Sequence, residues 1–97
     1  MEAECFLTDN GSAEIIVDYV ARATNDARVG RVRLFVEDAI LEDSGIINDI
    51  EYREQEVIPV PGGSQRTLRV EATPSGSASR ATVRATVRCP GEPSPRA

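Results

Sequence analysis

Acidic residues gather in one stretch of the sequence and are the first side chains with the chemistry to hold a ligand. The stretch spans residues 37–49 and contains Glu37, Asp38, Glu42, Asp43 and Asp49. Carboxylate oxygens crowded in a loop are ligands that Ca²⁺ prefers, so calcium binding is one interpretation. The spacing matches no EF-hand loop, and acidic surface loops are commonly just hydrated. We therefore expect a domain without metal or cofactor and keep calcium as the weaker alternative.

Residues for acid–base or nucleophilic catalysis are scarce. The chain contains no His, which removes the commonest general base and the ordinary serine and cysteine triads. Paired carboxylates such as Glu42 and Asp43 could in principle serve a glycosidase. A sugar cleft also needs aromatic side chains, and the chain has two Tyr, two Phe and no Trp. We expect this protein not to be an enzyme.

Arginines recur at every fourth residue in the stretch from Ser79 to Cys89. Strand alternation would place small apolar residues on one side and polar residues on the other; the inward set is Ala81, Val83, Ala85, Val87 and Cys89, and the outward set is Arg80, Thr82, Arg84, Thr86 and Arg88. The outward residues are typical of an exposed strand that stays soluble. Alternatively, Arg80, Arg84 and Arg88 are a docking face whose guanidinium groups meet carboxylates of a protein partner.

Two cysteines, Cys5 and Cys89, lie near opposite ends of the chain. A disulfide between them would close a long loop and stabilise the domain by roughly 4 to 5 kcal/mol in the chain-entropy picture. Such a bridge favours a location on the extracellular, cell or virion surface rather than the reducing cytosol. The alternative is two separate buried thiols. The first residues show no signal peptide, and no apolar run approaches the roughly 18 residues of a membrane span.

Charge is divided unevenly along the chain. Residues 1–60 carry 14 Asp and Glu against 5 Arg, whereas residues 61–97 carry 2 Glu against 6 Arg. We expect the two halves to pair their charges across a sheet. The formal net charge of −5 would repel a phosphate backbone, so we expect no nucleic-acid partner.

Apolar residues alternate with polar ones through most of the chain, which predicts strands. The clear segments are residues 2–8, 13–23, 29–37, 56–60, 65–73 and 79–89. Pro59 and Pro61 confine the fourth of these to a sheet edge. Between the third and fourth of these segments, residues 38–45 could form one helical turn or an irregular crossover. Residues 46–52 fit either a strand or a helix face. We favour a strand for 46–52 because its neighbours are strands.

About seven strands separated by turn signals are the signature of an all-β sandwich or barrel. The chain resembles the immunoglobulin-like and fibronectin type III group of sandwiches over residues 2–89, in architecture and without a family motif. It departs from antibody domains because it has no Trp and because Cys5 and Cys89 would join the first strand to the last. We expect a seven-stranded antiparallel sandwich in one domain, residues 1–89, and a Pro-rich flexible tail, residues 90–97. A small β-barrel is the alternative.

These observations favour a structural or protein-interaction module that works by contact with a protein partner or by self-assembly. Two settings fit: a virion surface, as a capsid decoration or tail-associated protein, and a bacterial cell surface, as an accessory domain. The alternative is a small secreted inhibitor or ligand-binding sandwich, which would need a protruding apolar loop. Ile40 and Leu41 supply the candidate, and their exposure would favour that class.

Overall fold

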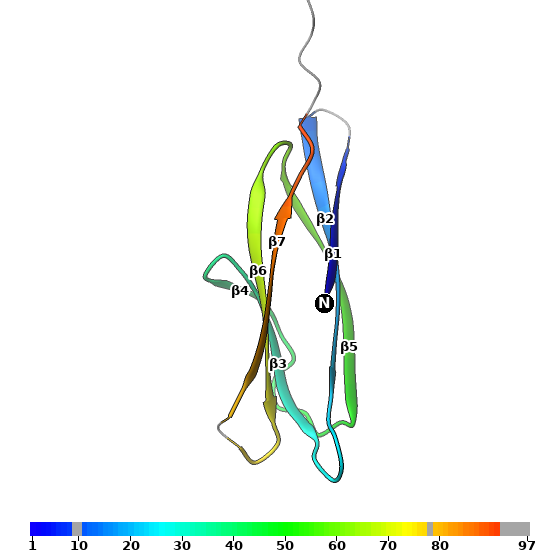
Figure 1. The fold of residues 1–97 in the computed structure, drawn as a ribbon, viewed down its shortest axis with the longest axis vertical. Coiled ribbons are helices and arrows are strands. Elements are labelled where there is room, and N and C mark those ends of the chain that lie inside the picture. The colour runs from blue at the N-terminus through cyan, green and yellow to red at the C-terminus, as the bar shows by residue number, and fades with distance from the viewer. Residues whose placement is uncertain (9–10, 78, 92–97) are drawn as a thin grey trace, which may run out of the picture.

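The fold is a β-sandwich of two antiparallel sheets (Figure 1). The structure, a computed structural model, describes residues 1–8, 11–77 and 79–91. Its strands are β1 (Glu2–Leu7), β2 (Ser12–Arg22), β3 (Val29–Val36), β4 (Ala39–Asp43), β5 (Glu51–Pro61), β6 (Gln65–Pro74) and β7 (Ala81–Arg88). One sheet has the order β1-β2-β5 and the other the order β4-β3-β6-β7. The two sheets do not close into a barrel, so the sandwich expectation is confirmed and the barrel alternative is wrong.

The core lies between the two sheets and follows from the alternation in the sequence. In β2 every second residue is buried, and Ile15 and Val17 are fully covered. Leu34 of β3 and Leu68 of β6 are buried from the facing sheet and are likewise 0% exposed. β5 lies at the edge of its sheet, which confirms the position that its prolines predicted.

A disulfide joins the first strand to the residue after the last. Cys5 and Cys89 are bonded, with their Cα atoms 5.1 Å apart, so the predicted bridge is confirmed. It ties β1 to β7 across the edge where the two sheets meet. We call the part of the β2–β7 edge beside this bridge the closed half, and the part beside Val20–Arg22 and Ala81–Val83 the open half.

The region from residue 38 to residue 54 differs from its prediction. Neither a helical turn nor an irregular crossover forms at 38–45, because β4 pairs with β3 as a hairpin. Glu37 occupies the tight turn with a φ of 56°, and its backbone N–H donates to the Thr67 carbonyl. The expected strand at 46–52 exists only from Glu51 onward, apart from a single bridge between Asp49 and Val29.

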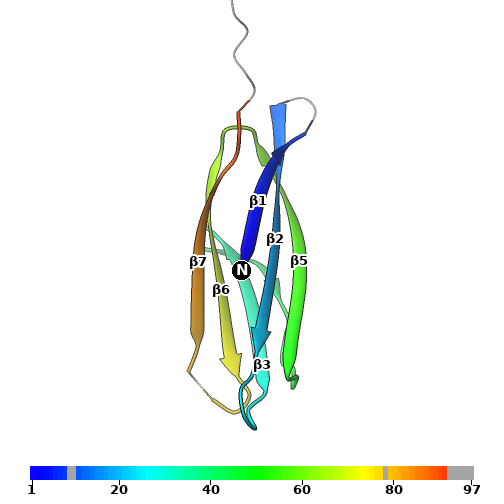
Figure 2. The ribbon, with the colours of Figure 1, turned by 45° about the vertical axis from the view of Figure 1, so that its right-hand side comes forward.

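Burial along β7 also departs from the pattern. Val87 is 8% exposed, as an inward residue should be, but Val83 is 50% exposed. Both side chains are on the inward side, since Val83 pairs with the buried Val70. The difference arises because β1 pairs with β2 only as far as Asp18, so it covers the closed half alone. Figure 2 shows β1 running beside the upper part of β2 only.

The proposed tail begins at Pro90, and its residues 92–97 lie outside the described residues. In the described part of the chain, no helix is long and apolar enough to cross a bilayer.

Candidate interaction surfaces

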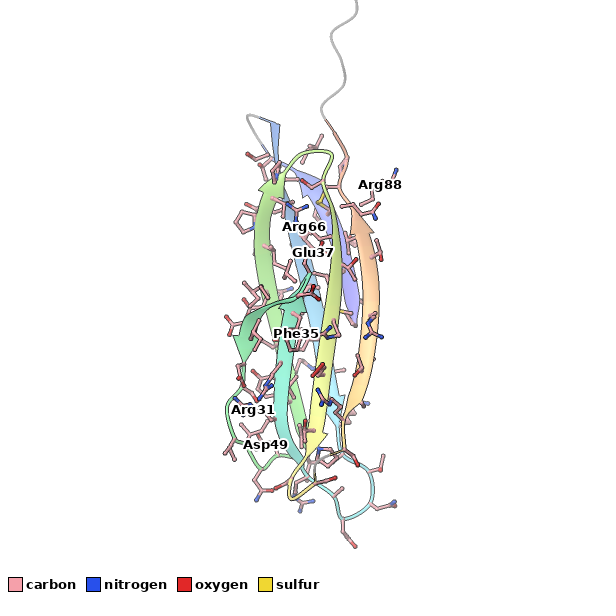
Figure 3. All side chains as sticks on the ribbon, turned by 90° about the vertical axis from the view of Figure 1, so that its left-hand side faces the viewer. Arg31, Phe35, Glu37, Asp49, Arg66 and Arg88 are labelled. Atoms are coloured by element: carbon pink, nitrogen blue, oxygen red, sulfur yellow. A yellow bond between two sulfur atoms is a disulfide. The ribbon has the colours of Figure 1, made fainter. Side chains whose placement is uncertain are left out.

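Arginines from three strands share the outer surface of the four-stranded sheet. Because paired residues of an antiparallel sheet point to the same side, the register places the arginines of β3, β6 and β7 together. Arg80, directly before β7, joins them through its ion pair with Glu71. We call this surface the arginine face; its cations are Arg31, Arg33, Arg69, Arg80, Arg84 and Arg88. Figure 3 looks onto it, with Arg31 and Phe35 along β3 and Arg88 at the upper end of β7.

Asp43 is the carboxylate that holds one side of the arginine face. Arg31 donates two hydrogen bonds to it, Nε to Oδ1 at 2.9 Å and Nη2 to Oδ2 at 2.6 Å. Arg33 Nε lies 3.5 Å from Oδ2. The Arg31 hydrogen bonds, helped by the Gly45 N–H, lower the pKa of Asp43 to about 2. This carboxylate is therefore fully charged at neutral pH and clamps β4 to β3.

Glu71 of β6 is a second carboxylate that holds two arginines of the arginine face. Its two oxygens each lie 3.2 Å from an arginine, Arg69 Nε on one side and Arg80 Nη1 on the other. The Arg69 guanidinium also stacks over the Phe35 ring at 4.0 Å from its centre. That cation–π contact explains how an outward Phe35 is only 7% exposed.

Two carboxylates do not balance the charge of the arginine face. Among the described residues, Arg84 has no ion-pair or hydrogen-bond partner, and Arg88 donates only to the neutral Gln65 amide at 3.0 Å. A shallow polar hollow of about 200 Å³ lies in the same face, lined by Arg31, Arg33, Glu71, Thr73 and Arg80. Its three guanidinium groups share two carboxylates, Glu71 in the lining and Asp43 beside Arg31 and Arg33, so the hollow keeps a net positive charge, which suits a carboxylate or another anion.

The outer surface of the three-stranded sheet has the opposite character. Glu2, Glu4, Glu14 and Asp18 lie on it, and Glu2 is directly opposite Asp18. Among the described residues none of these four carboxylates has an arginine within ion-pair distance. The predicted pairing of charges between residues 1–60 and 61–97 is wrong for the described residues, because every ion pair joins two residues of the same part. Asp43 pairs with Arg31 and Arg33, and Glu71 pairs with Arg69 and Arg80.

The β3–β4 hairpin carries exposed apolar residues at the margin of the arginine face. Ile40 is 52% and Leu41 is 42% exposed, as the ligand-binding alternative requires. They lie in a strand and not in the loop that the sequence suggested. Ile40 pairs with Phe35, and the register shifts between Leu34 and Phe35, so Leu41 is the extra residue of a β-bulge. Figure 1 shows β4 projecting from the sandwich.

The candidate calcium ligands serve other contacts. Glu37 Oε1 accepts a hydrogen bond from the Thr67 backbone N–H at 3.0 Å, and Asp43 is held by Arg31. Asp49 lies beside the start of β3 through its backbone. Within residues 1–8, 11–77 and 79–91, no group of three or more acidic or Cys side chains is placed to hold a metal ion.

Acidic residues of β4 and β5 lie near Tyr19. Burial raises the pKa of Tyr19 and of Glu56, and the neighbouring carboxylates of Glu42 and Glu54 raise both further. Tyr52 donates from its hydroxyl to Glu54 at 3.2 Å. Burial and that hydrogen bond raise the Tyr52 pKa as well. The cost of crowding these carboxylates is eased by the partial exposure of the β5 edge.

Of the predicted binding residues, Arg80, Arg84 and Arg88 do lie on one outward surface, while Ile40 lies at the opposite margin of the same sheet. Sequence reasoning did not connect Arg31, Arg33 and Arg69 with them. The alternation of β3 and β6 placed these three on outward sides, but only the strand order brings the three strands next to one another.

Comparisons of the chain with protein-family models, with curated proteins and with solved structures find no match in any of the three.

Proposed function

We propose that this domain is a non-enzymatic interaction module that binds an acidic surface of a protein partner through its arginine face. The observation that carries the proposal is the charge imbalance of that face: four of its six arginines share Asp43 and Glu71, and among the described residues Arg84 and Arg88 have no ion pair. Bidentate guanidinium–carboxylate contacts are strong and directional. A partner that supplies carboxylates to Arg84 and to the hollow beside Arg31 would complete the pairing.

The arrangement of strands supports an immunoglobulin-like module of the fibronectin type III kind. The three-stranded sheet β1-β2-β5 faces the four-stranded sheet β4-β3-β6-β7, which is the division seen in that group. Such sandwiches act as structural and binding modules on surfaces. The Cys5–Cys89 disulfide supports an oxidising setting, namely a virion surface, as in a capsid decoration or tail-associated protein, or a bacterial cell surface.

The test is a titration with a defined acidic probe, a short oligoglutamate peptide, followed by nuclear magnetic resonance at low and high salt. We expect shifts at Arg84, Arg88 and Arg31, and weaker binding as salt rises. The double variant Arg84→Glu with Arg88→Glu should lose binding while its melting temperature stays close to the wild type, because both side chains are exposed.

The matched control is Arg22→Glu with Arg53→Glu, which makes the same charge change on the other sheet. Both control side chains are 65% exposed, and this variant should keep binding at the arginine face. Equal loss of binding in the two double variants would show that binding depends on the net charge of the protein and not on the arginine face. A loss of stability without a loss of binding in the Arg84 and Arg88 variant would overturn the proposal.

A second candidate function is that of a small secreted inhibitor or ligand-binding protein, and the exposure of Ile40 and Leu41 favours it. Exposed apolar residues on a bulged hairpin are suited to insertion into a partner's pocket. The test is inhibition of a set of purified secreted proteases by the wild type and by Ile40→Asp with Leu41→Asp. Inhibition that the double variant abolishes would support this candidate, and absence of inhibition by the wild type would remove it.

A further inference from the structure

An apolar cleft of about 500 Å³ opens between the two sheets along the open half of the β2–β7 edge. Its floor is formed by small and branched apolar side chains from both sheets, among them Ala21, Val29, Val70, Ala72 and Val83. The cleft exists because β1 ends its pairing with β2 at Asp18. Val83, on the inward side of β7, is therefore 50% exposed.

Backbone hydrogen-bonding groups line the same opening. Alternate residues of a strand direct their N–H and C=O groups to opposite neighbours. Ala23 donates its N–H to Ile50, on the β5 side of β2, so the backbone groups of Val20 and Arg22 face the other side. Since β1 stops at Asp18, no described strand pairs with Val20 or Arg22 there. This segment of β2 is a free edge that another strand can join.

The surroundings of the cleft are positively charged. Its lining includes Arg22, Arg28 and Arg80, and no Asp or Glu among the described residues. Arg22 is paired with Glu51 and Arg80 with Glu71. Among the residues that the structure describes, Arg28 donates only to the neighbouring Ala27 carbonyl, at 3.0 Å. An occupant with carboxylates on its solvent side would be attracted by these cations, Arg28 above all.

We propose that this cleft accepts an extended, acidic segment of a partner protein as an added strand beside β2. The segment would continue the ladder that β1 begins, with its backbone bonded to Val20 and Arg22. About four residues of strand span this part of the edge. Alternate small apolar side chains would enter the cleft against Val83, and the acidic residues between them would lie on the outer surface of the sheet, beside Arg22. This site shares Arg80 with the arginine face, but its argument from the free edge of β2 stands whether or not the proposed function does.

The experiment uses the intact protein and a defined probe, the peptide Ac-Glu-Val-Glu-Ala-Glu-Val-Glu-NH2. Binding is followed by amide shifts and by amide hydrogen exchange at single residues. We expect the Val20 and Arg22 amides to exchange more slowly with peptide, while Ala21, which already faces β5, changes little. A peptide with Arg in place of each Glu should bind at least tenfold more weakly. Peptide shifts confined to the arginine face, or no protection at Val20 and Arg22, would overturn the proposal.

Two substitutions of one residue separate the backbone contact from the side chain. Val20→Pro removes the N–H that faces the free edge and leaves the β5 ladder donors in place, so peptide binding should fall roughly three- to tenfold. Val20→Thr keeps that N–H and is the matched control, with unchanged binding expected. Equal affinity in the two variants would contradict strand addition.

Two further variants test the side-chain contacts without relying on the fold tolerating a proline. Val83→Glu places a carboxylate in the cleft at a half-exposed position and should abolish binding of the acidic peptide. Arg28→Glu should weaken it, and less so at high salt. Binding that survives both changes would overturn the proposal. Concentration-dependent dimerisation of the protein alone, abolished by Val83→Glu, would overturn it in favour of a second copy as the occupant.

Discussion

The closed and open halves of the β2–β7 edge are made from the same strands and differ in what covers them. In the closed half, β1 pairs with β2 and the Cys5–Cys89 bridge ties it to β7. In the open half, β2 and β7 continue without β1. Val87 and Val83 occupy equivalent inward positions of one strand, yet they are 8% and 50% exposed. Whether an inward side chain of β7 is buried depends on the strand that covers it from the facing sheet. Alternation within β7 only directs the side chain inward.

The largest loss of stability should come from removing the disulfide of the closed half. Replacing both cysteines, Cys5→Ser with Cys89→Ser, removes a bridge across a sequence separation of 84 residues. We expect a loss of roughly 4 to 5 kcal/mol in the free energy of unfolding, because the unfolded chain regains the freedom that the loop restrained. Urea unfolding measures it. A loss below about 1 kcal/mol would show that β1 is held by packing alone.

Hydrogen exchange on the same variant sharpens the comparison. The β1 amides should lose protection to the greatest extent, and the amides of β3 and β6 should follow only the global loss of stability. Uniform loss of protection would mean that the two halves do not behave differently.

The next largest effect should be a difference in stability between side-chain truncations in the closed half and in the open half. Ile15→Ala removes a fully buried side chain in the closed half and should cost about 2 to 5 kcal/mol. Val83→Ala in the open half should cost under about 1 kcal/mol, since half of that side chain already meets water. Thermal unfolding of the two variants checks this. Similar costs at both positions would contradict an open cleft at Val83.

Enlarging an alanine of β7 should also distinguish the closed half from the open half, with a smaller loss of stability. Ala85 and Ala81 both lie on the inward side of β7, opposite Leu68 and Ala72. Ala85 is half-buried and Ala81 is exposed. Ala85→Leu should overpack the core at about 1 to 3 kcal/mol. Ala81→Leu should stay within about 0.5 kcal/mol of the wild type, as at an unconstrained surface site. Equal destabilisation by the two changes would mean that the cleft is filled.

The sequence was sufficient for the elements whose signal is local. Alternation located β1, β2, β3, β6 and β7 to within about two residues of their ends, and the prolines placed β5 at an edge. The cysteines indicated the bridge because their positions allowed no other partner within the chain.

The rest depends on contacts between distant segments. β4 is a strand because β3 lies beside it and Arg31 clamps Asp43, whereas its own residues also suit a helix. The arginine face depends on the order β3-β6-β7. The open half depends on β1 pairing no further than Asp18. None of these three facts leaves a periodic trace in the sequence, so pattern reasoning could not find them.

The smallest effect concerns β4, an edge strand held by an ion pair instead of a disulfide. The pKa of Asp43 is lowered to about 2 from 3.8 by Arg31, so its stabilising contribution is present above about pH 4 and is lost as the pH falls toward 2. The pair is partly exposed, which limits the contribution to about 1 kcal/mol or less. Asp43→Asn should therefore be slightly less stable than the wild type at pH 7, and the difference should shrink as the pH falls from 4 through 2. A difference as large at pH 2 as at pH 7 would show that Asp43 holds β4 through its shape or its hydrogen bond to Gly45, not through charge.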